Sequence, residues 1–286
     1  MTKNKLVSVI IANYNNQIYL EQCLNSVLAQ TYENIEIVVV DDCSTDNSLD
    51  LLRKYEEKYP QIKVFVNEKN SGVTKTRMNA IAKAAGDYIT TLDADDYYMC
   101  EMKIEKEMEL ISKFKNEQNK DIVAFSNYNL VDINGGLKIN YAKSYKVQTG
   151  NIMDVYFLRK KFCPRDFVMS KHQYYAAGSY DEQMPIYEDI DLDIRLASKY
   201  EFHYTGCEGT AYRDTKKGLS ASNIRYKNKW SFYERKKNFH LLKKKKYLIK
   251  ANTYLEYYVI ILLQYIPTHF KQSIKRCIHF GYKTSQ

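Results

Sequence analysis

The chain has 286 residues, of which 45% are hydrophobic, and a formal net charge of +9. Its length and apolar content exclude a disordered chain and leave room for one large domain with an appendage. The six cysteines contain no C-x-x-C pair. This excludes a disulfide framework or a cysteine zinc site and favours reduced thiols in a cytosolic protein.

Charge is distributed unevenly along the chain. Residues 225–286 hold 15 Lys and Arg against 2 Glu, so the first 224 residues hold 28 of the 43 basic and 32 of the 34 acidic side chains. We therefore predict a mildly acidic globular domain over residues 1–224 and a basic, aromatic, helical tail over residues 225–286.

Strands and helices alternate through the first hundred residues. Short apolar runs rich in β-branched residues predict buried strands at 7–11, 35–40, 62–66 and 87–92. Apolar positions at helical spacing predict helices around 20–28, 46–59 and 74–85. The first apolar run is too short for a signal peptide and has no small-residue cleavage site. The alternation predicts an α/β fold with a mostly parallel sheet flanked by helices.

Beyond residue 100 the alternation loosens. We predict a helix over 101–115, then a strand that runs into a hairpin over 121–140 with its turn at Gly135 and Gly136. A further helix is predicted over 187–200, with acidic residues in its first turn where the helix dipole favours them. The runs 201–206 and 209–214 predict strands that return to the sheet.

Polar groups follow each of the first four predicted strands. The segments are "ANYN" (12–15), "DDCSTDNS" (41–48), "NEKNSG" (67–72) and "DADD" (93–96). The carboxyl ends of parallel strands share one edge, so these groups are expected to converge on a single ligand site. The alternative for one acidic motif alone is a helix N-cap, formed by Asp42 or Ser44.

The "DADD" motif needs compensation for its charge. Asp93, Asp95 and Asp96 would raise one another's pKa unless a cation or hydrogen-bond donors compensate. A divalent cation such as Mg²⁺ or Mn²⁺ takes carboxylate oxygens and keeps positions for water and phosphate. The motif therefore predicts a metal–diphosphate site. Two roles stay open for Asp96, a cap of the following helix or a holder of metal-bound water.

These motifs, taken together, resemble glycosyltransferase family 2, whose members have the GT-A fold. The resemblance rests on residues 8–48 and 67–96, then on "YEDIDLDIRL" (187–196) and "AYRDTKKGLSAS" (211–222). It covers roughly residues 6–222 and implies a GT-A, Rossmann-like catalytic domain. Residues 1–100 would form its nucleotide-sugar-binding half and residues 101–224 its acceptor-binding half.

The resemblance implies roles on the donor side. Ala12, Asn13 and Tyr14 match the segment that lines the nucleotide base and ribose. Asp42 matches the carboxylate that binds the uracil edge, and Arg77 falls where a basic residue approaches the base.

The resemblance also implies the metal ligands and the catalytic base. Asp93, Ala94 and Asp95 match the D-x-D motif, with Asp93 near the ribose and the metal and Asp95 holding the metal that bridges the diphosphate. Asp189 matches the general base, which suits a helix N-terminus because the dipole there favours the anion.

Two departures from the family pattern affect the metal and nucleotide contacts. Thr215 stands where the family commonly has a His that contacts the metal or phosphate, so Asp214 or water would have to serve as third ligand. Met78 and Ala12 replace a usual Asn and Pro.

The function implied is inverting transfer of a sugar from a nucleotide donor, with UDP favoured, to a hydroxyl of a glycan or lipid-linked acceptor. Bacterial surface polysaccharide or lipopolysaccharide synthesis is the expected setting, with Mn²⁺ or Mg²⁺ as cofactor. The alternatives are a sugar-phosphate nucleotidyltransferase and a non-catalytic nucleotide-sugar-binding protein. The first would need a glycine-rich, basic phosphate loop, and "ANYNNQIYLEQ" contains neither glycine nor a basic residue.

The tail leaves three interpretations open. Its apolar segment at 254–266 is too short to span a bilayer, which takes about 20 residues. The tail could pack on the domain, lie on an anionic membrane surface, or bind nucleic acid, the least favoured of the three. The membrane interpretation would place a cytoplasmic protein peripherally on the inner membrane.

Overall fold

The computed structural model describes residues 4–157, 161–216 and 222–244. The chain divides after Ser222 into two compact units. The predicted tail beyond residue 244, including its apolar segment, lies outside the described residues.

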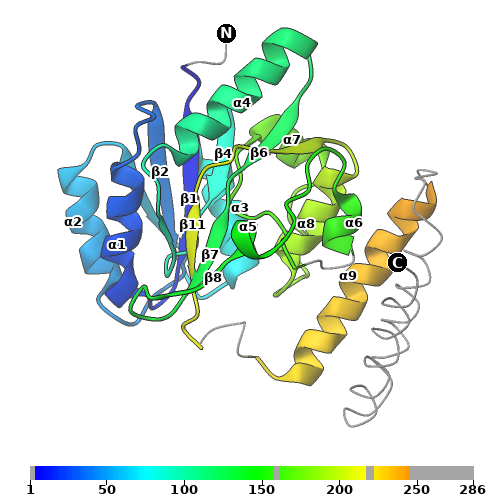
Figure 1. Cartoon of the computed structure of the whole chain (residues 1–286). Coiled ribbons are helices and arrows are strands. Elements are labelled where there is room, and N and C mark those ends of the chain that lie inside the picture. Colours follow the sequence, from blue (N-terminus) through cyan, green and yellow to red (C-terminus); the bar gives the residue numbers. More distant parts are fainter. Residues whose placement is uncertain (1–3, 158–160, 217–221, 245–286) are drawn as a thin grey trace. The chain divides into compact units, whose positions relative to one another are not determined.

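The first unit begins with the alternation that the sequence predicts (Figure 1). Its strands are β1 (Val7–Asn13), β2 (Ile35–Asp41), β3 (Ile62–Val66) and β4 (Tyr88–Thr91). The helices between them are α1 (Gln17–Leu28), α2 (Ser48–Lys58) and α3 (Val73–Lys83). All four strands are parallel, in the order β3-β2-β1-β4, and the short β9 (Met169–Ser170) adds an antiparallel edge next to β4. The predicted α/β class is confirmed.

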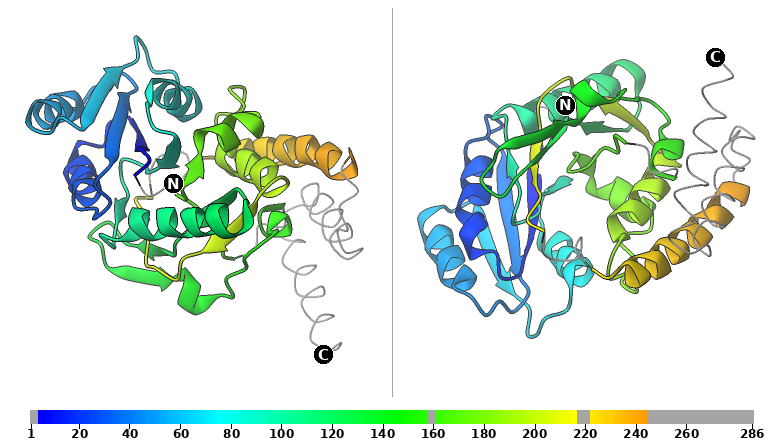
Figure 2. Two further views of the ribbon diagram at one scale, coloured as in Figure 1. Left: turned by 90° about the horizontal axis from the view of Figure 1, so that it is seen from above. Right: turned by 60° about the horizontal axis from the view of Figure 1, so that its bottom comes forward.

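Helices cover both faces of this sheet (Figure 2). Alternate residues of β1 and β2 pack with apolar side chains of α1 and α2 and of α4 (Lys103–Gln118) on one face. The other face of β1 and β2 is covered by α3. Because both faces are buried, the strands read as continuous apolar runs rather than as an alternating pattern.

The two strands predicted at 201–206 and 209–214 do not return to the main sheet, contrary to prediction. The segment predicted as one long strand divides into β6 (Ile122–Phe125) and β7 (Tyr128–Val131), and β8 (Leu137–Asn140) completes the predicted hairpin. β10 (Glu201–Tyr204) pairs only with β6 among the described strands. β11 (Thr210–Arg213) lies between β7 and β5 (Tyr97–Tyr98) in a four-stranded sheet. Neither β10 nor β11 pairs with β4, whose edge is already occupied by β9.

The remaining helices of the first unit are short. They are α5 (Tyr141–Ser144), α6 (Met153–Phe157), α7 (Lys171–Ala176) and α8 (Glu188–Ala197). α8 confirms the predicted acidic first turn. Its N-cap residue, Tyr187, has a left-handed φ of 66°. This conformation costs energy for a residue with a side chain and is frequent at functional sites.

The second unit is described only by α9 (Ile224–Lys244). This helix is rich in lysine and arginine, and the Trp230 ring lies edge-on to Tyr226 and Tyr233. Among the described helices, none is long and apolar enough to cross a membrane.

Candidate active site

The ends of β1 and β2 are linked by a hydrogen-bond network. The Asn13 side chain donates to Asp41 (2.7 Å), and Asp41 also accepts from the backbone N–H (2.8 Å) and the hydroxyl (2.7 Å) of Ser44. Asn13 is buried, Ala12 is half-buried and Tyr14 is exposed. The structure therefore brings the predicted segment 12–14 to the carboxyl edge of the sheet, with the Tyr14 ring accessible.

Asp42 supports the loop that leads into α3. Its carboxylate accepts from the Asn67 side chain (2.7 Å) and from the backbone N–H groups of Ser71 and Gly72 (2.8 Å each). Gly72 has a φ of 83°, which glycine adopts without the penalty that other residues incur. Asp42 does not cap α2, the helix that follows it, and neither does Ser44. The N-cap alternative for these two residues is therefore wrong.

The three carboxylates of the "DADD" turn form a cluster. One oxygen from each of Asp93, Asp95 and Asp96 lies within 4.8 Å of the others. Cys23 Sγ contacts the Asp93 carbonyl oxygen at 3.6 Å, which ties the turn to α1. The turn follows β4 directly, so it stands at the same sheet edge as Asn13 and Asp42.

Two arginines neutralise Asp93. Arg77, from α3, donates to Asp93 Oδ1, and Arg165 donates to Asp93 Oδ2 at 3.1 Å. Burial acts to raise the pKa of Asp93, but the two guanidinium groups outweigh it and the pKa is lowered. Asp93 is therefore held as an anion.

Asp95 has a different environment. Burial and the neighbouring charge of Asp93 raise the pKa of Asp95 to about 6. In the part of the chain that the structure describes, the Asp95 carboxylate accepts no hydrogen bond from another side chain. Asp95 is therefore the carboxylate of the cluster with the most lone pairs available to bind a ligand.

Asp96 is buried and does not cap the helix that follows it, while its other expected role, holding a metal-bound water, stays a prediction. Its carboxylate accepts from Arg165 (3.0 Å) and from the backbone N–H of Arg213 in β11 (2.8 Å). Burial keeps the pKa of Asp96 well above its usual range even though Arg165 acts to lower it. The helix that follows, α4, has no side-chain cap. The prediction of a helix cap is wrong, and Asp96 instead connects the turn to β11.

The acidic start of α8 reaches the same cluster through Arg77. This arginine donates to Glu188 as well as to Asp93, so it bridges α8 and the "DADD" turn. Burial and the adjacent Asp189 raise the pKa of Glu188 to about 7, although Arg77 acts to lower it. Asp189 is exposed, and its carboxylate accepts from the N–H of Ile190 (2.7 Å). The structure therefore places Arg77 against the carboxylate cluster and Asp189 on the helix turn that Arg77 contacts through Glu188.

Arg77 is buried between two carboxylates and is engaged by both. The contact with the nucleotide base that the family resemblance implies for it stays a prediction. Asp214, considered as a substitute metal ligand, forms ion pairs with Lys138 (3.0 Å) and Lys216 (2.7 Å) and is not a member of the carboxylate cluster.

Two residues next to the carboxylate cluster, Arg165 and Asp166, were not predicted from the sequence. Arg165 Nε donates to Asp166 at 2.8 Å, and the guanidinium stacks on the Tyr212 ring at 4.2 Å. The only local signal was a charged pair, "RD", directly before the apolar run of β9. Glu188 was also not assigned, although it adjoins Asp189.

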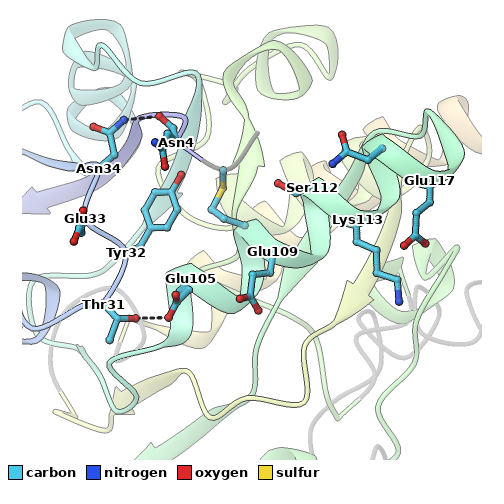
Figure 3. A pocket seen from close by; sticks show the side chains of 12 residues that line it. Asn4, Thr31, Tyr32, Glu33, Asn34, Glu105, Glu109, Ser112, Lys113 and Glu117 are labelled. Atoms are coloured by element: carbon cyan, nitrogen blue, oxygen red, sulfur yellow. Dashed lines mark hydrogen bonds between the residues drawn. The ribbon is translucent and has the colours of Figure 1, made fainter. Parts of the chain in front are cut away.

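A pocket in the described part of the chain lies away from this cluster (Figure 3). It has a volume of about 780 Å³ and is lined by residues around 31–34 and by one side of α4. These residues precede β2, so the pocket stands at the amino edge of the sheet and contains no member of the carboxylate cluster.

The fold and the family motifs define a glycosyltransferase. The model of the family described as "Glycosyl transferase family 2" matches residues 8–175, more than half of the chain. The chain belongs to this family.

Individual relatives agree with this assignment. An uncharacterised glycosyltransferase of Haemophilus influenzae is 33% identical over 179 residues, which are 60% of this chain and 69% of that protein. The putative teichuronic acid biosynthesis glycosyltransferase TuaG of Bacillus subtilis is 42% identical over 106 residues, which are 37% of this chain. That match spans only 42% of the length of TuaG.

Solved structures show the same fold. TarS residues 1–349 of S. aureus, in complex with UDP-GlcNAc, superpose with a TM-score of 0.65 at 20% identity. The match covers 88% of this chain and 70% of that one. The complex of the same protein with UDP gives a TM-score of 0.62.

Proposed function

We propose that the protein is an inverting glycosyltransferase that transfers a sugar from a UDP-sugar to a hydroxyl of a glycan or lipid-linked acceptor. The observation that carries the proposal is the Arg77 bridge, which joins a three-carboxylate cluster at the sheet edge to the helix start that bears Asp189. Donor activation and acceptor deprotonation need such groups side by side. UDP is favoured because the fold neighbour TarS was solved with UDP and with UDP-GlcNAc.

The cluster fits a divalent cation. Its donor atoms are carboxylate oxygens, which Mg²⁺ and Mn²⁺ prefer, and the Asp95 carboxylate is unpaired among the described side chains. Asp95 would hold the ion, and a bound cation would supply charge stabilisation for a leaving diphosphate.

Asp189 is assigned as the general base. It is exposed, so an acceptor hydroxyl can reach it, and the first turn of α8 favours its anionic form. Taking the acceptor proton at one Asp189 oxygen would make the acceptor oxygen nucleophilic. Glu188 and Arg77 hold the start of the helix in place and leave the Asp189 carboxylate free for this step.

A donor screen tests the proposal. The full chain is incubated with Mn²⁺ and each of the common UDP-, GDP- and dTDP-sugars, and the release of nucleoside diphosphate is measured. Release with one UDP-sugar above the rate of spontaneous hydrolysis, increased by an acceptor glycan, is the expected result. Release only from a GDP- or dTDP-sugar would contradict the UDP assignment. No release of nucleoside diphosphate from any of these sugars would contradict the whole proposal.

The setting that we propose is the synthesis of a bacterial surface polysaccharide, with lipopolysaccharide included. The support is the similarity to TuaG, which is described as a putative teichuronic acid biosynthesis glycosyltransferase, together with the basic character of α9. Residues 225–286 would associate peripherally with an anionic membrane, where each Lys or Arg contributes roughly 1 kcal/mol.

Vesicle sedimentation tests the membrane association. The full chain is expected to sediment with vesicles that contain phosphatidylglycerol and not with pure phosphatidylcholine, and salt should release it, since the attraction is electrostatic. Equal sedimentation with both kinds of vesicle, or with neither, would contradict an electrostatic membrane contact.

A further inference from the structure

Arg165 is the most connected cation at the carboxylate cluster. It lies in the segment before β9, outside the motifs that carry the family resemblance. Its guanidinium pairs with Asp93, Asp96 and Asp166 at 2.8–3.1 Å and stacks on the Tyr212 ring. The side chain is 24% exposed, so it is partly accessible to a ligand.

The backbone that presents Arg165 is fixed. The carbonyl oxygen of Asp166 accepts from the Thr90 hydroxyl (3.0 Å) and from Lys103 Nζ (2.5 Å). Lys103 is itself buried and paired with Glu107 at 3.0 Å. Asp166 has a left-handed φ of 50°, a conformation that a residue with a side chain rarely adopts. The guanidinium is therefore held at the cluster by buried groups of β4 and α4.

The three carboxylates of the cluster differ in how many hydrogen-bond donors surround them. Both carboxylate oxygens of Asp93 accept from guanidinium groups, and both oxygens of Asp96 accept from Arg165 and the Arg213 backbone. Asp95 alone accepts nothing from other described side chains. Each carboxylate oxygen has two lone pairs, so these contacts occupy about half of the acceptor capacity of Asp93 and of Asp96, and Asp95 offers a divalent cation the most unshared lone pairs.

We propose that Arg165 is a positioning residue of the donor site, which holds Asp93 and Asp96 in internal ion pairs and leaves Asp95 as the one carboxylate of the cluster that binds the divalent cation. This inference rests on the proposed function and narrows the expected ligand pair of Asp93 and Asp95 to Asp95. Arg165 thereby supplies positive charge that balances Asp93 and Asp96, in place of contacts between these carboxylates and the cation.

Titration of the full chain with Mn²⁺ in the absence of nucleotide tests the proposal, with free Mn²⁺ followed by electron paramagnetic resonance. Arg165→Gln is expected to bind Mn²⁺ about tenfold more tightly than the unmodified chain, because a unit positive charge is lost from a partly solvated site and one oxygen of Asp93 loses its ion pair. A residue that merely supported the fold would weaken the binding of Mn²⁺ when removed. Arg165→Lys keeps the charge and is expected to restore most of the original affinity.

The carboxylates supply a second measurement that does not depend on Arg165 variants. Asp95→Asn is expected to lower Mn²⁺ affinity by more than roughly tenfold, and Asp93→Asn by less than about threefold, since only Asp95 would be a ligand. Arg53→Gln, which removes an exposed arginine from α2, is the matched control and is expected to leave Mn²⁺ binding unchanged.

The failures of this inference and of the proposed function are distinguishable. If the unmodified chain binds neither Mn²⁺ nor UDP, the proposed function fails. If it binds both, the inference is overturned by an equal or weaker Mn²⁺ affinity in Arg165→Gln. It is also overturned if Asp93→Asn loses as much affinity as Asp95→Asn. Circular dichroism checks that each variant is folded. If Arg165→Gln does not fold, the comparison of Mn²⁺ affinity between Asp93→Asn and Asp95→Asn tests the inference instead.

Discussion

Substitution of Asp189 by Asn is expected to lower the rate of sugar transfer by about 10²–10⁴-fold, the usual contribution of a positioned general base. The amide is nearly isosteric with the carboxylate and can still accept from the Ile190 N–H, so the start of α8 should keep its geometry. It cannot take a proton from the acceptor. Nucleotide binding is therefore expected to stay unchanged, and calorimetry with UDP and Mn²⁺ would measure it alongside turnover.

A matched control for this variant is Asp50→Asn. Asp50 is an exposed acid in the first turn of another helix, α2, and it takes no part in the cluster. Its loss should leave turnover within experimental error of the unmodified chain. If Asp189→Asn turns over as fast as this control, another residue is the base.

Substitution of Asp95 by Ala is expected to abolish the metal-dependent part of nucleotide binding. In the presence of Mn²⁺ the affinity for UDP should fall at least about tenfold, which corresponds to about 1.4 kcal/mol. Without metal, the variant and the unmodified chain should bind UDP equally, because Asp95 would act only through the cation. Isothermal calorimetry with and without Mn²⁺ measures both quantities.

Asp87→Ala is the matched control for Asp95. Asp87 stands just before β4, at the opposite end of the strand from the "DADD" turn, and pairs with the exposed Lys5 at 2.8 Å. Its removal should leave both affinities unchanged. An Asp95→Ala variant that still responds to Mn²⁺ as strongly as Asp87→Ala would contradict a metal-binding role for Asp95.

The first hundred residues could be predicted well because their structure is local. Each apolar run is long enough for one strand, and the helix between two such runs forces a parallel crossover. The polar strand ends then follow from topology alone. The sequence therefore predicts Asn13, Asp42 and the "DADD" turn at one edge of the sheet, and the parallel pairing of β1 with β2 and β4 confirms this.

The second half of the domain could not be predicted in the same way. The break between β6 and β7 separates strands of two different sheets, since β6 pairs with β10 and β7 pairs with β11 and β8. The partners β10 and β11 lie about 80 residues further along the chain, so no local pattern predicts the break. Arg165 was missed for a related reason. It meets Asp93 across a separation of 72 residues, and no periodic pattern records such a contact.

The ion pairs and hydrogen bonds of the "DADD" turn have a consequence for folding. Its counter-ions and donors come from Arg77, Arg165 and the backbone of Arg213, the last of them 117 residues from Asp96. A chain released at residue 100 would carry these acids without most of their partners, and unpaired buried charge is costly. The first hundred residues alone therefore do not stabilise the buried conformation of this turn, which needs Arg165 and the backbone of Arg213. We therefore expect the two halves of the domain and the carboxylate cluster to form together, in a step limited by long loop closures rather than by local order.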